Sequence, residues 1–140
     1  PLSPLSPYGI TKLAGEYYLN YFYKSYGILY IALRYSNVYG PRQNPDGEAG
    51  VVAVFSKKLI NGESPIINGD GRQTRDYICV NDVVKANIAG LKSDEVGTFN
   101  IGTGVETDVN SLFEHLKDII NTNKKPRYGP QKTVSKKGAV

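Results

Sequence analysis

The amino-acid sequence predicts an α/β fold, because helix-type and strand-type segments alternate along most of its 140 residues. Three observations support this prediction. A helical segment opens with a capping signal at Ser6-Pro7, several short runs rich in Ile, Leu, Ala and Tyr have the length of strands, and Gly, Asn and Pro separate the segments. The length corresponds to about one domain, and a hydrophobic content of 40% is that of an ordinary folded protein.

The first predicted helix begins at Ser6-Pro7, a capping residue followed by proline at the first helical position. It ends near Gly27, because glycine readily adopts the left-handed conformation that stops a helix. Its apolar face consists of Leu13, Tyr17, Leu19, Tyr21 and Phe22. We expect the tyrosines of this helix to be packing residues rather than a cofactor site; they are Tyr17, Tyr18, Tyr21, Tyr23 and Tyr26.

The remaining segments continue the alternation. The predicted strands are Ile28–Tyr35, Pro65–Asn68, Arg75–Val80 and Thr98–Ile101. The predicted helices are Val51–Ile60, a helix from Asn81 or Asp82 to about Leu91, and Asn110–Asn121. A loop over Asn37–Gly50 is expected because glycine and proline recur in it.

Gly102-Thr-Gly104 follows a predicted strand, which invites comparison with a dinucleotide-binding loop. The third glycine of that motif is missing, since position 107 is Thr, and no acid stands about 20 residues further on. We therefore predict a tight turn between a strand and a helix. A phosphate-binding loop of the G-x-x-x-x-G-K-[ST] type is also missing from the sequence.

The net charge of +4 comes from the C-terminal segment. Residues 124–140 contain six basic residues and no acid, so residues 1–123 carry 11 basic and 13 acidic residues. A basic tail can bind nucleic acid. This one has a single aromatic residue and no patterned stripe, so we expect a solvated, disordered or truncated terminus and no nucleic-acid partner.

Composition also narrows the class of protein. Cys79 is the only cysteine, which excludes an internal disulfide and fits a reducing compartment, so a cytoplasmic location is expected. His115 is the only histidine, so we predict no metal site and no histidine triad, and we expect His115 at the surface. The sequence has no apolar run near the roughly 20 residues that span a bilayer, and we expect no membrane partner.

Tyr8 and Lys12 are the strongest chemical signal in the sequence. Residues four apart lie on the same face of a helix, one turn apart. A free phenol, with a pKa of about 10, is a poor base near neutrality, but a neighbouring ammonium favours the phenolate. The pair is therefore suited to proton transfer at an alcohol or sugar hydroxyl. The bare Tyr-x-x-x-Lys pattern also arises by chance on solvated helices.

Four segments give this pair a context: Ser6–Glu16, Leu33–Arg42, Asn68–Asp82 and Phe99–Gly104. In this order they resemble the extended short-chain dehydrogenases that modify nucleotide sugars, and they span most of residues 3–120. Among the epimerases and dehydratases of that family, the closest resemblance is to UDP-glucose 4-epimerases. The resemblance implies an α/β chain that combines part of a Rossmann-like NAD-binding fold with most of a smaller substrate-binding domain.

The resemblance implies roles for six residues. Tyr8 would be the catalytic acid/base, and Lys12 would hold the nicotinamide ribose of NAD beside it. Tyr35 would lie near the nicotinamide. Asn37, Asn68 and Arg75 would bind the nucleotide sugar, with Arg75 on a diphosphate oxygen. Without the resemblance, Tyr35 could be a core aromatic, Asn37 a turn cap, and Arg75 a surface residue paired with Asp76 or Asp82. Arg34 and Arg72 are expected to be structural.

The resemblance further implies that the glycine-rich NAD loop and a catalytic Ser or Thr lie N-terminal to this chain. We therefore expect a C-terminal-side part of a larger enzyme, which would form a homodimer when intact. Residues 1–50 would complete the Rossmann-like domain, residues 51–123 would form the substrate-binding region, and residues 124–140 would form the basic tail.

The implied activity is NAD-dependent epimerisation of a nucleotide sugar at C4, through a transient 4-keto sugar. Two alternatives stay open. One is a 4,6-dehydratase or a UDP-glucuronate decarboxylase on the same scaffold. The other is a structural or binding module without activity of its own.

Overall fold

The computed structural model describes residues 3–46 and 50–131 as an α/β arrangement of four helices and eight short strands. The helices are α1 (Pro7–Tyr26), α2 (Val51–Ile60), α3 (Val80–Leu91) and α4 (Val109–Ile120). The strands are β1 (Ile31–Tyr35), β2 (Asn37–Tyr39), β3 (Ile66–Asn68), β4 (Thr74–Arg75), β5 (Tyr77–Cys79), β6 (Gly97–Ile101), β7 (Thr107–Asp108) and β8 (Arg127–Gly129). The α/β fold predicted from the sequence is confirmed.

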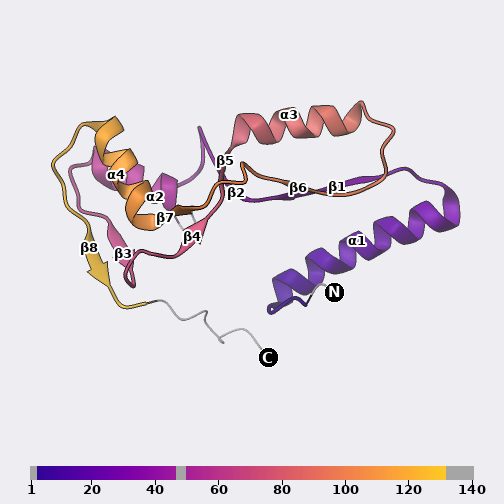
Figure 1. Cartoon of the computed structure of the whole chain (residues 1–140), viewed down its shortest axis with the longest axis horizontal. Coiled ribbons are helices and arrows are strands. Elements are labelled where there is room, and N and C mark those ends of the chain that lie inside the picture. Colours follow the sequence, from indigo (N-terminus) through magenta and orange to yellow (C-terminus); the bar gives the residue numbers. More distant parts are fainter. Residues whose placement is uncertain (1–2, 47–49, 132–140) are drawn as a thin grey trace.

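The structure has two parts joined at one point (Figure 1). In one part, β1 pairs in parallel with β6, and α1 and α3 lie on opposite sides of these strands (Figure 1). In the other part, α2 and α4 pack beside the parallel pair β3 and β8 and the antiparallel pair β4 and β7. The parallel pair β2 and β5 lies between the two parts.

The hydrophobic core belongs to the second part. Its buried members are Phe55, Leu59, Ile67, Val109 and Phe113. The rings of Phe55 and Phe113 meet edge to face with their centroids 6.3 Å apart, a favourable geometry for aromatic pairs. This cluster fixes α2 against α4.

The first helix follows the local signals in its sequence. The Ser6 hydroxyl caps α1 by accepting a hydrogen bond from the Gly9 amide at 3.1 Å, and Gly27 ends the helix with φ of 69°. The expectation that its tyrosines pack holds only in part: no residue of α1 is buried, and the five side chains are between 39% and 67% exposed. Tyr21 and Tyr26 contact each other and Phe22, and Tyr23 contacts Tyr30, which lies beyond the end of α1.

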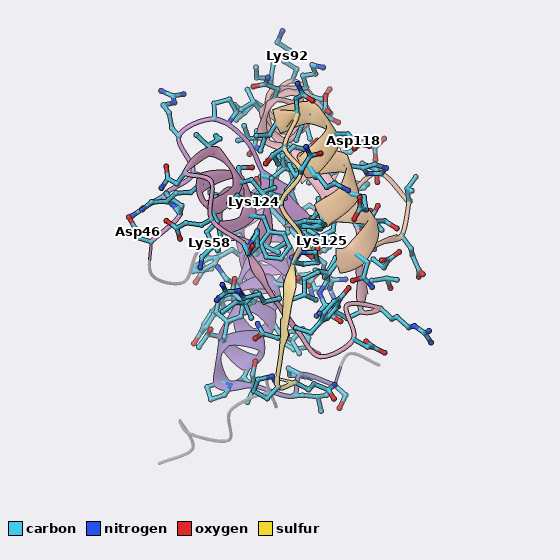
Figure 2. All side chains as sticks on the ribbon, turned by 90° about the vertical axis from the view of Figure 1, so that its left-hand side faces the viewer. Asp46, Lys58, Lys92, Asp118, Lys124 and Lys125 are labelled. Atoms are coloured by element: carbon cyan, nitrogen blue, oxygen red, sulfur yellow. The ribbon has the colours of Figure 1, made fainter. Side chains whose placement is uncertain are left out.

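Three short strands were not predicted. Strand β2 lies within the expected loop 37–50, β7 separates Gly104 from α4, and β8 lies within the expected tail. Each has only two or three residues, too few for a recognisable alternation. Figure 2 shows Lys124 and Lys125 on the segment between α4 and β8, so this part of the basic segment has a defined position. Residues 132–140 lie outside the described residues.

The predicted strand boundaries also need correction. Strand β1 begins at Ile31 rather than Ile28. The single strand expected over Arg75–Val80 is two strands, broken at Asp76, because β4 pairs with β7 and β5 pairs with β2. Val80 is the first residue of α3 instead of the last residue of a strand.

Candidate active site

The first turn of α1 presents Tyr8 and Lys12 together. Pro7 occupies the start of the helix, so Tyr8 stands in its first turn, 72% exposed. The Lys12 Nζ lies over the Tyr8 ring, 5.3 Å from its centroid. The two side chains therefore share one helix face, as their spacing predicted, with the ammonium held against the phenol.

Tyr8 and Lys12 line a cavity of about 820 Å³ between α1 and β1, which we call the α1–β1 cavity. Its opposite wall contains residues of β1 and the segment that follows it, including Tyr35, Ser36 and Val38. A phenol and an ammonium thus face a space large enough for part of a cofactor together with a sugar.

An ion pair holds α1 against β1 at this cavity. Arg34 donates from Nε to the Glu16 Oε1 at 2.7 Å, and its Nη2 reaches the other carboxylate oxygen. The hydrogen bonds from Arg34 hold the pKa of Glu16 below its ordinary value. Arg34 is therefore a structural residue, as expected, and it helps to set the distance between the helix and the strand.

Tyr35 is not a core aromatic. Its side chain is 45% exposed, and its hydroxyl donates to the Asn87 Oδ1 of α3 at 2.9 Å. Asn87 is in turn fixed by donating from Nδ2 to the Val83 carbonyl at 2.7 Å. Asn87, which the sequence analysis did not select, thus holds the Tyr35 side chain on the α3 side of β1, where both residues line a further cavity of about 340 Å³.

A second cavity, of about 340 Å³, gathers the three residues predicted to bind the nucleotide sugar. We call it the substrate cavity, after the predicted role of these three residues. Asn37 comes from β2, Asn68 from the end of β3 and Arg75 from β4, so residues far apart in the sequence line one space. Gln73 and Tyr77 complete the polar lining, and neither was predicted.

Arg75 does not form the ion pair with Asp76 or Asp82 that its surface interpretation would require. Its guanidinium donates to the Thr74 carbonyl at 2.7 Å. Asp82 pairs instead with Lys85 at 2.8 Å, and Asp76 bonds to the turn after β6. Among residues 3–46 and 50–131, no carboxylate forms an ion pair with Arg75. Its charge is available to a ligand in the substrate cavity.

Asn37 does not cap a turn; it begins β2. The extended segment from Tyr35 to Val38 lines both cavities, with different residues facing each. Ser36 and Val38 line the α1–β1 cavity, whereas Asn37 lines the substrate cavity, as expected for alternating residues of an extended chain. One short segment therefore contributes to both spaces.

Comparison with known proteins assigns this arrangement to a family. A family model described as "NAD dependent epimerase/dehydratase family" matches residues 1–102. The chain belongs to this family. The resemblance noted in the sequence is thereby confirmed, and the fold is that of its Rossmann-type members.

Individual members of the epimerase/dehydratase family are similar over most of the chain. A putative UDP-glucose 4-epimerase from Methanocaldococcus jannaschii is 54% identical over 121 residues, which are 86% of this chain and 39% of that protein. UDP-glucose 4-epimerase from Mycolicibacterium smegmatis is 44% identical over 131 residues, 93% of this chain and 42% of that protein. The chain therefore spans about two fifths of the length of these curated relatives.

Solved structures of UDP-glucose 4-epimerases also superpose on this chain. The crystal structure of UDP-glucose 4-epimerase from Thermotoga maritima with UDP-glucose superposes with a TM-score of 0.91 at 50% identity, over 94% of this chain and 43% of that one. The enzyme from Thermus thermophilus, solved with NAD, gives a TM-score of 0.82 at 38% identity, over 93% of this chain and 42% of that one. Among the curated relatives, a dehydratase is also similar in sequence. The human dTDP-D-glucose 4,6-dehydratase is 35% identical over 121 residues, 86% of this chain and 34% of that protein.

The residues of the α1–β1 cavity fit one end of NAD, the cofactor on which the family depends. The Lys12 ammonium is a donor for ribose hydroxyls, and the Tyr8 phenol stands beside it on the same wall. Nothing in the sequence fits the pyrophosphate, because no glycine-rich loop of the required pattern occurs. Within residues 3–46 and 50–131, no group of three or more His, Cys, Asp or Glu side chains is placed to hold a metal ion. In the same ranges, no helix is both long and apolar enough to cross a bilayer.

Proposed function

We propose that this chain supplies the acid/base pair and a large part of the substrate site of an NAD-dependent nucleotide-sugar 4-epimerase. The observation that carries the proposal is the substrate cavity, where Asn37, Asn68 and Arg75 meet next to the segment that also borders Tyr8 and Lys12. The relatives named UDP-glucose 4-epimerase support a UDP-glucose or UDP-galactose substrate.

Tyr8 removes the proton from the 4-hydroxyl of the sugar and later returns it. The Lys12 ammonium lies over the phenol ring, on the same helix face as the Tyr8 hydroxyl that takes part in this step. Lys12 also donates to the ribose of the cofactor. Tyr8 and Lys12 would hold the nicotinamide ribose of NAD, and the bound cofactor would supply reversible hydride transfer at C4, so that the net reaction is redox-neutral.

The nucleotide part of the substrate binds in the substrate cavity. The Arg75 guanidinium is always charged and planar, which suits it to a diphosphate oxygen. Asn37 donates to the sugar nucleotide from β2, and Asn68 lies toward the base from the end of β3. Binding energy from this remote part of the substrate holds the sugar ring in reach of Tyr8.

Replacing Tyr8 by Phe tests the catalytic assignment. In the full-length gene product, Tyr8→Phe should lower the turnover of UDP-galactose by about 10²- to 10⁴-fold, the usual contribution of a general acid/base. Tyr18→Phe is the matched control, because Tyr18 is an equally exposed tyrosine of α1 that lines neither cavity. Near-normal turnover in Tyr8→Phe would mean that another group transfers the proton.

The product distinguishes the 4-epimerase from its sister enzymes. The similarity to dTDP-D-glucose 4,6-dehydratases keeps a dehydratase as the second candidate. Incubation with UDP-glucose should give UDP-galactose, resolved by chromatography. A 4-keto-6-deoxy sugar would replace the epimerase proposal with the dehydratase, and loss of CO₂ from UDP-glucuronate would replace it with the decarboxylase.

Two expectations stay predictions. A cytoplasmic location is supported by the single cysteine, Cys79. A homodimer of the intact enzyme is to be tested by light scattering of the full-length gene product.

A further inference from the structure

We propose that Asp76 is a positioning residue for the substrate cavity, which holds Arg75 and Asn37 in place by anchoring its carboxylate in the turn after β6. This inference rests on the proposed function only in taking the substrate cavity as a nucleotide site. Asp76 itself lines neither the α1–β1 cavity nor the substrate cavity.

The carboxylate of Asp76 accepts three hydrogen bonds from two consecutive residues. Its Oδ1 accepts from the Thr103 amide at 3.0 Å and from the Thr103 hydroxyl at 2.7 Å. Its Oδ2 accepts from the Gly104 amide at 2.9 Å. Asp76 and Thr103 are 27 residues apart in the sequence, so these hydrogen bonds connect two distant segments.

The turn is shaped to receive this carboxylate. A Cβ atom at Gly102 would overlap the Asp76 Oδ2, so only glycine permits the close approach. Backbone amides of Gly-Thr-Gly thus bind an anion, as glycine-rich loops often do, but the anion is a side chain of the same protein. This contact accounts for the Gly102-Thr-Gly104 motif, which lacks the pattern of a dinucleotide-binding loop.

The backbone of Asp76 connects directly to the substrate cavity. Its carbonyl accepts a hydrogen bond from the Asn37 amide at 2.9 Å. Arg75 precedes it in the chain as the last residue of β4. Asp76 therefore lies between two residues of the cavity wall, bonded covalently to one and by a hydrogen bond to the other.

Asp76 also stands where strands change partners. Strand β1 pairs with β6 and the following strand β2 pairs with β5, so the pairing partner changes at Ser36. The Ser36 amide donates a hydrogen bond to the Ile101 carbonyl at 2.9 Å. In the same way, β4 pairs with β7 and β5 pairs with β2, so the pairing partner changes at Asp76. Because both segments change their pairing partner here, strand hydrogen bonds do not run continuously through this point. The side-chain hydrogen bonds of Asp76 then hold the two segments together.

The chemistry requires the ionised form. A carboxylate accepts bonds from three donors, whereas an amide would turn its own N–H₂ toward one of them. The hydrogen bonds from Thr103 hold the pKa of Asp76 below its ordinary value, so the anchor is charged near neutrality.

Substitution of Asp76 should affect substrate binding more than the chemical step. In the full-length gene product, Asp76→Asn should raise KM for UDP-galactose and Kd for UDP about 10- to 100-fold, the range for losing hydrogen bonds to a charged group. The kcat should change little, because binding remote from C4 is lost equally in ground and transition states. Asp70→Asn is the control: Asp70 also accepts a turn amide, that of Arg72 at 3.0 Å, and lines neither cavity, but it is not bonded to Asn37 or Arg75.

A double-mutant cycle separates positioning from general destabilisation. If Asp76 acts through Arg75, then Asp76→Asn should add little to the effect of Arg75→Gln on Kd for UDP. Effects that multiply, or a fall in kcat with KM and Kd unchanged, would overturn the proposal. If Asp76→Asn fails to fold, Thr103→Val removes one of the three bonds at an exposed site and should raise Kd by about 2- to 10-fold.

Calorimetric binding of UDP also keeps this test separate from the catalytic proposal. Loss of UDP affinity in Asp76→Asn, together with full turnover in Tyr8→Phe, would support the anchor and reject the catalytic assignment. Unchanged UDP affinity in both Asp76→Asn and Thr103→Val would reject the anchor and leave Tyr8 unaffected. Absence of UDP and dTDP binding by the unaltered protein would overturn both.

Discussion

The Lys12 ammonium lies over the face of the Tyr8 ring, 5.3 Å from the ring centroid. A cation in this position is attracted to the ring by about 0.5–1 kcal/mol at an exposed site. The contact keeps the ammonium beside the phenol, with both side chains on the exposed first turns of α1. At the scale of single residues, the proposed catalytic pair is therefore formed by α1 alone and needs no partner from the rest of the chain.

The Glu16–Arg34 pair makes a prediction about pH. Since the folded pKa of Glu16 is lowered by Arg34, the pair stabilises the fold fully above the ordinary carboxyl value of 4.5, and this contribution is lost as the pH falls through the lowered pKa. Glu16→Gln should therefore destabilise the protein at pH 7, and its difference from the unaltered protein should shrink as the pH falls through that lowered pKa. Urea denaturation across this range measures the difference.

Asp82→Asn provides the comparison for that experiment. Asp82 and Lys85 form an exposed pair one helical turn apart on α3, with side chains 54% and 77% exposed. Exposed pairs of this kind contribute little to stability. A pH-dependent loss in Asp82→Asn as large as that in Glu16→Gln would show that the Glu16–Arg34 geometry has no special effect.

At the scale of elements, α4 carries the packing of the second part of the molecule. Phe113 is 1% exposed and belongs to the core cluster that joins α4 to α2 and β3. Phe113→Ala should lower the free energy of unfolding by about 3–5 kcal/mol, because it removes a large buried ring and leaves a cavity. Chemical denaturation of the full-length gene product measures this loss.

Ile119→Ala on the same helix is the matched control. Ile119 is 79% exposed, so its truncation should change the free energy of unfolding by no more than about 0.5 kcal/mol. Similar losses in both variants would contradict the assignment of the α4 face that packs against α2.

At the scale of the whole molecule, the proposed cofactor site has residues for only one end of NAD. Tyr8 and Lys12 suit the nicotinamide ribose, but the sequence has no loop for the pyrophosphate. The 140-residue chain alone should therefore show neither epimerase activity nor micromolar affinity for NAD. Calorimetry with NAD tests this, and micromolar binding would mean that a phosphate site exists without the glycine-rich pattern.

Features that depend on near neighbours in the chain follow from the local sequence. The bounds of α1 follow from Ser6, Pro7 and Gly27, and α2 has the predicted range Val51–Ile60. The Tyr8–Lys12 face follows from helical spacing. The family is also readable from ordered local segments. Each of these depends on residues a few positions apart, which interact in the same way wherever the segment lies.

Only the tertiary structure decided which distant residues meet. The short strands β2, β7 and β8 exist because partners pair with them, and their own two or three residues carry no periodic signal. The break at Asp76 is a change of pairing partner, and its anchor lies 27 residues away. Exposed tyrosines of α1 looked like core residues because burial depends on what covers a helix face, which local sequence does not encode.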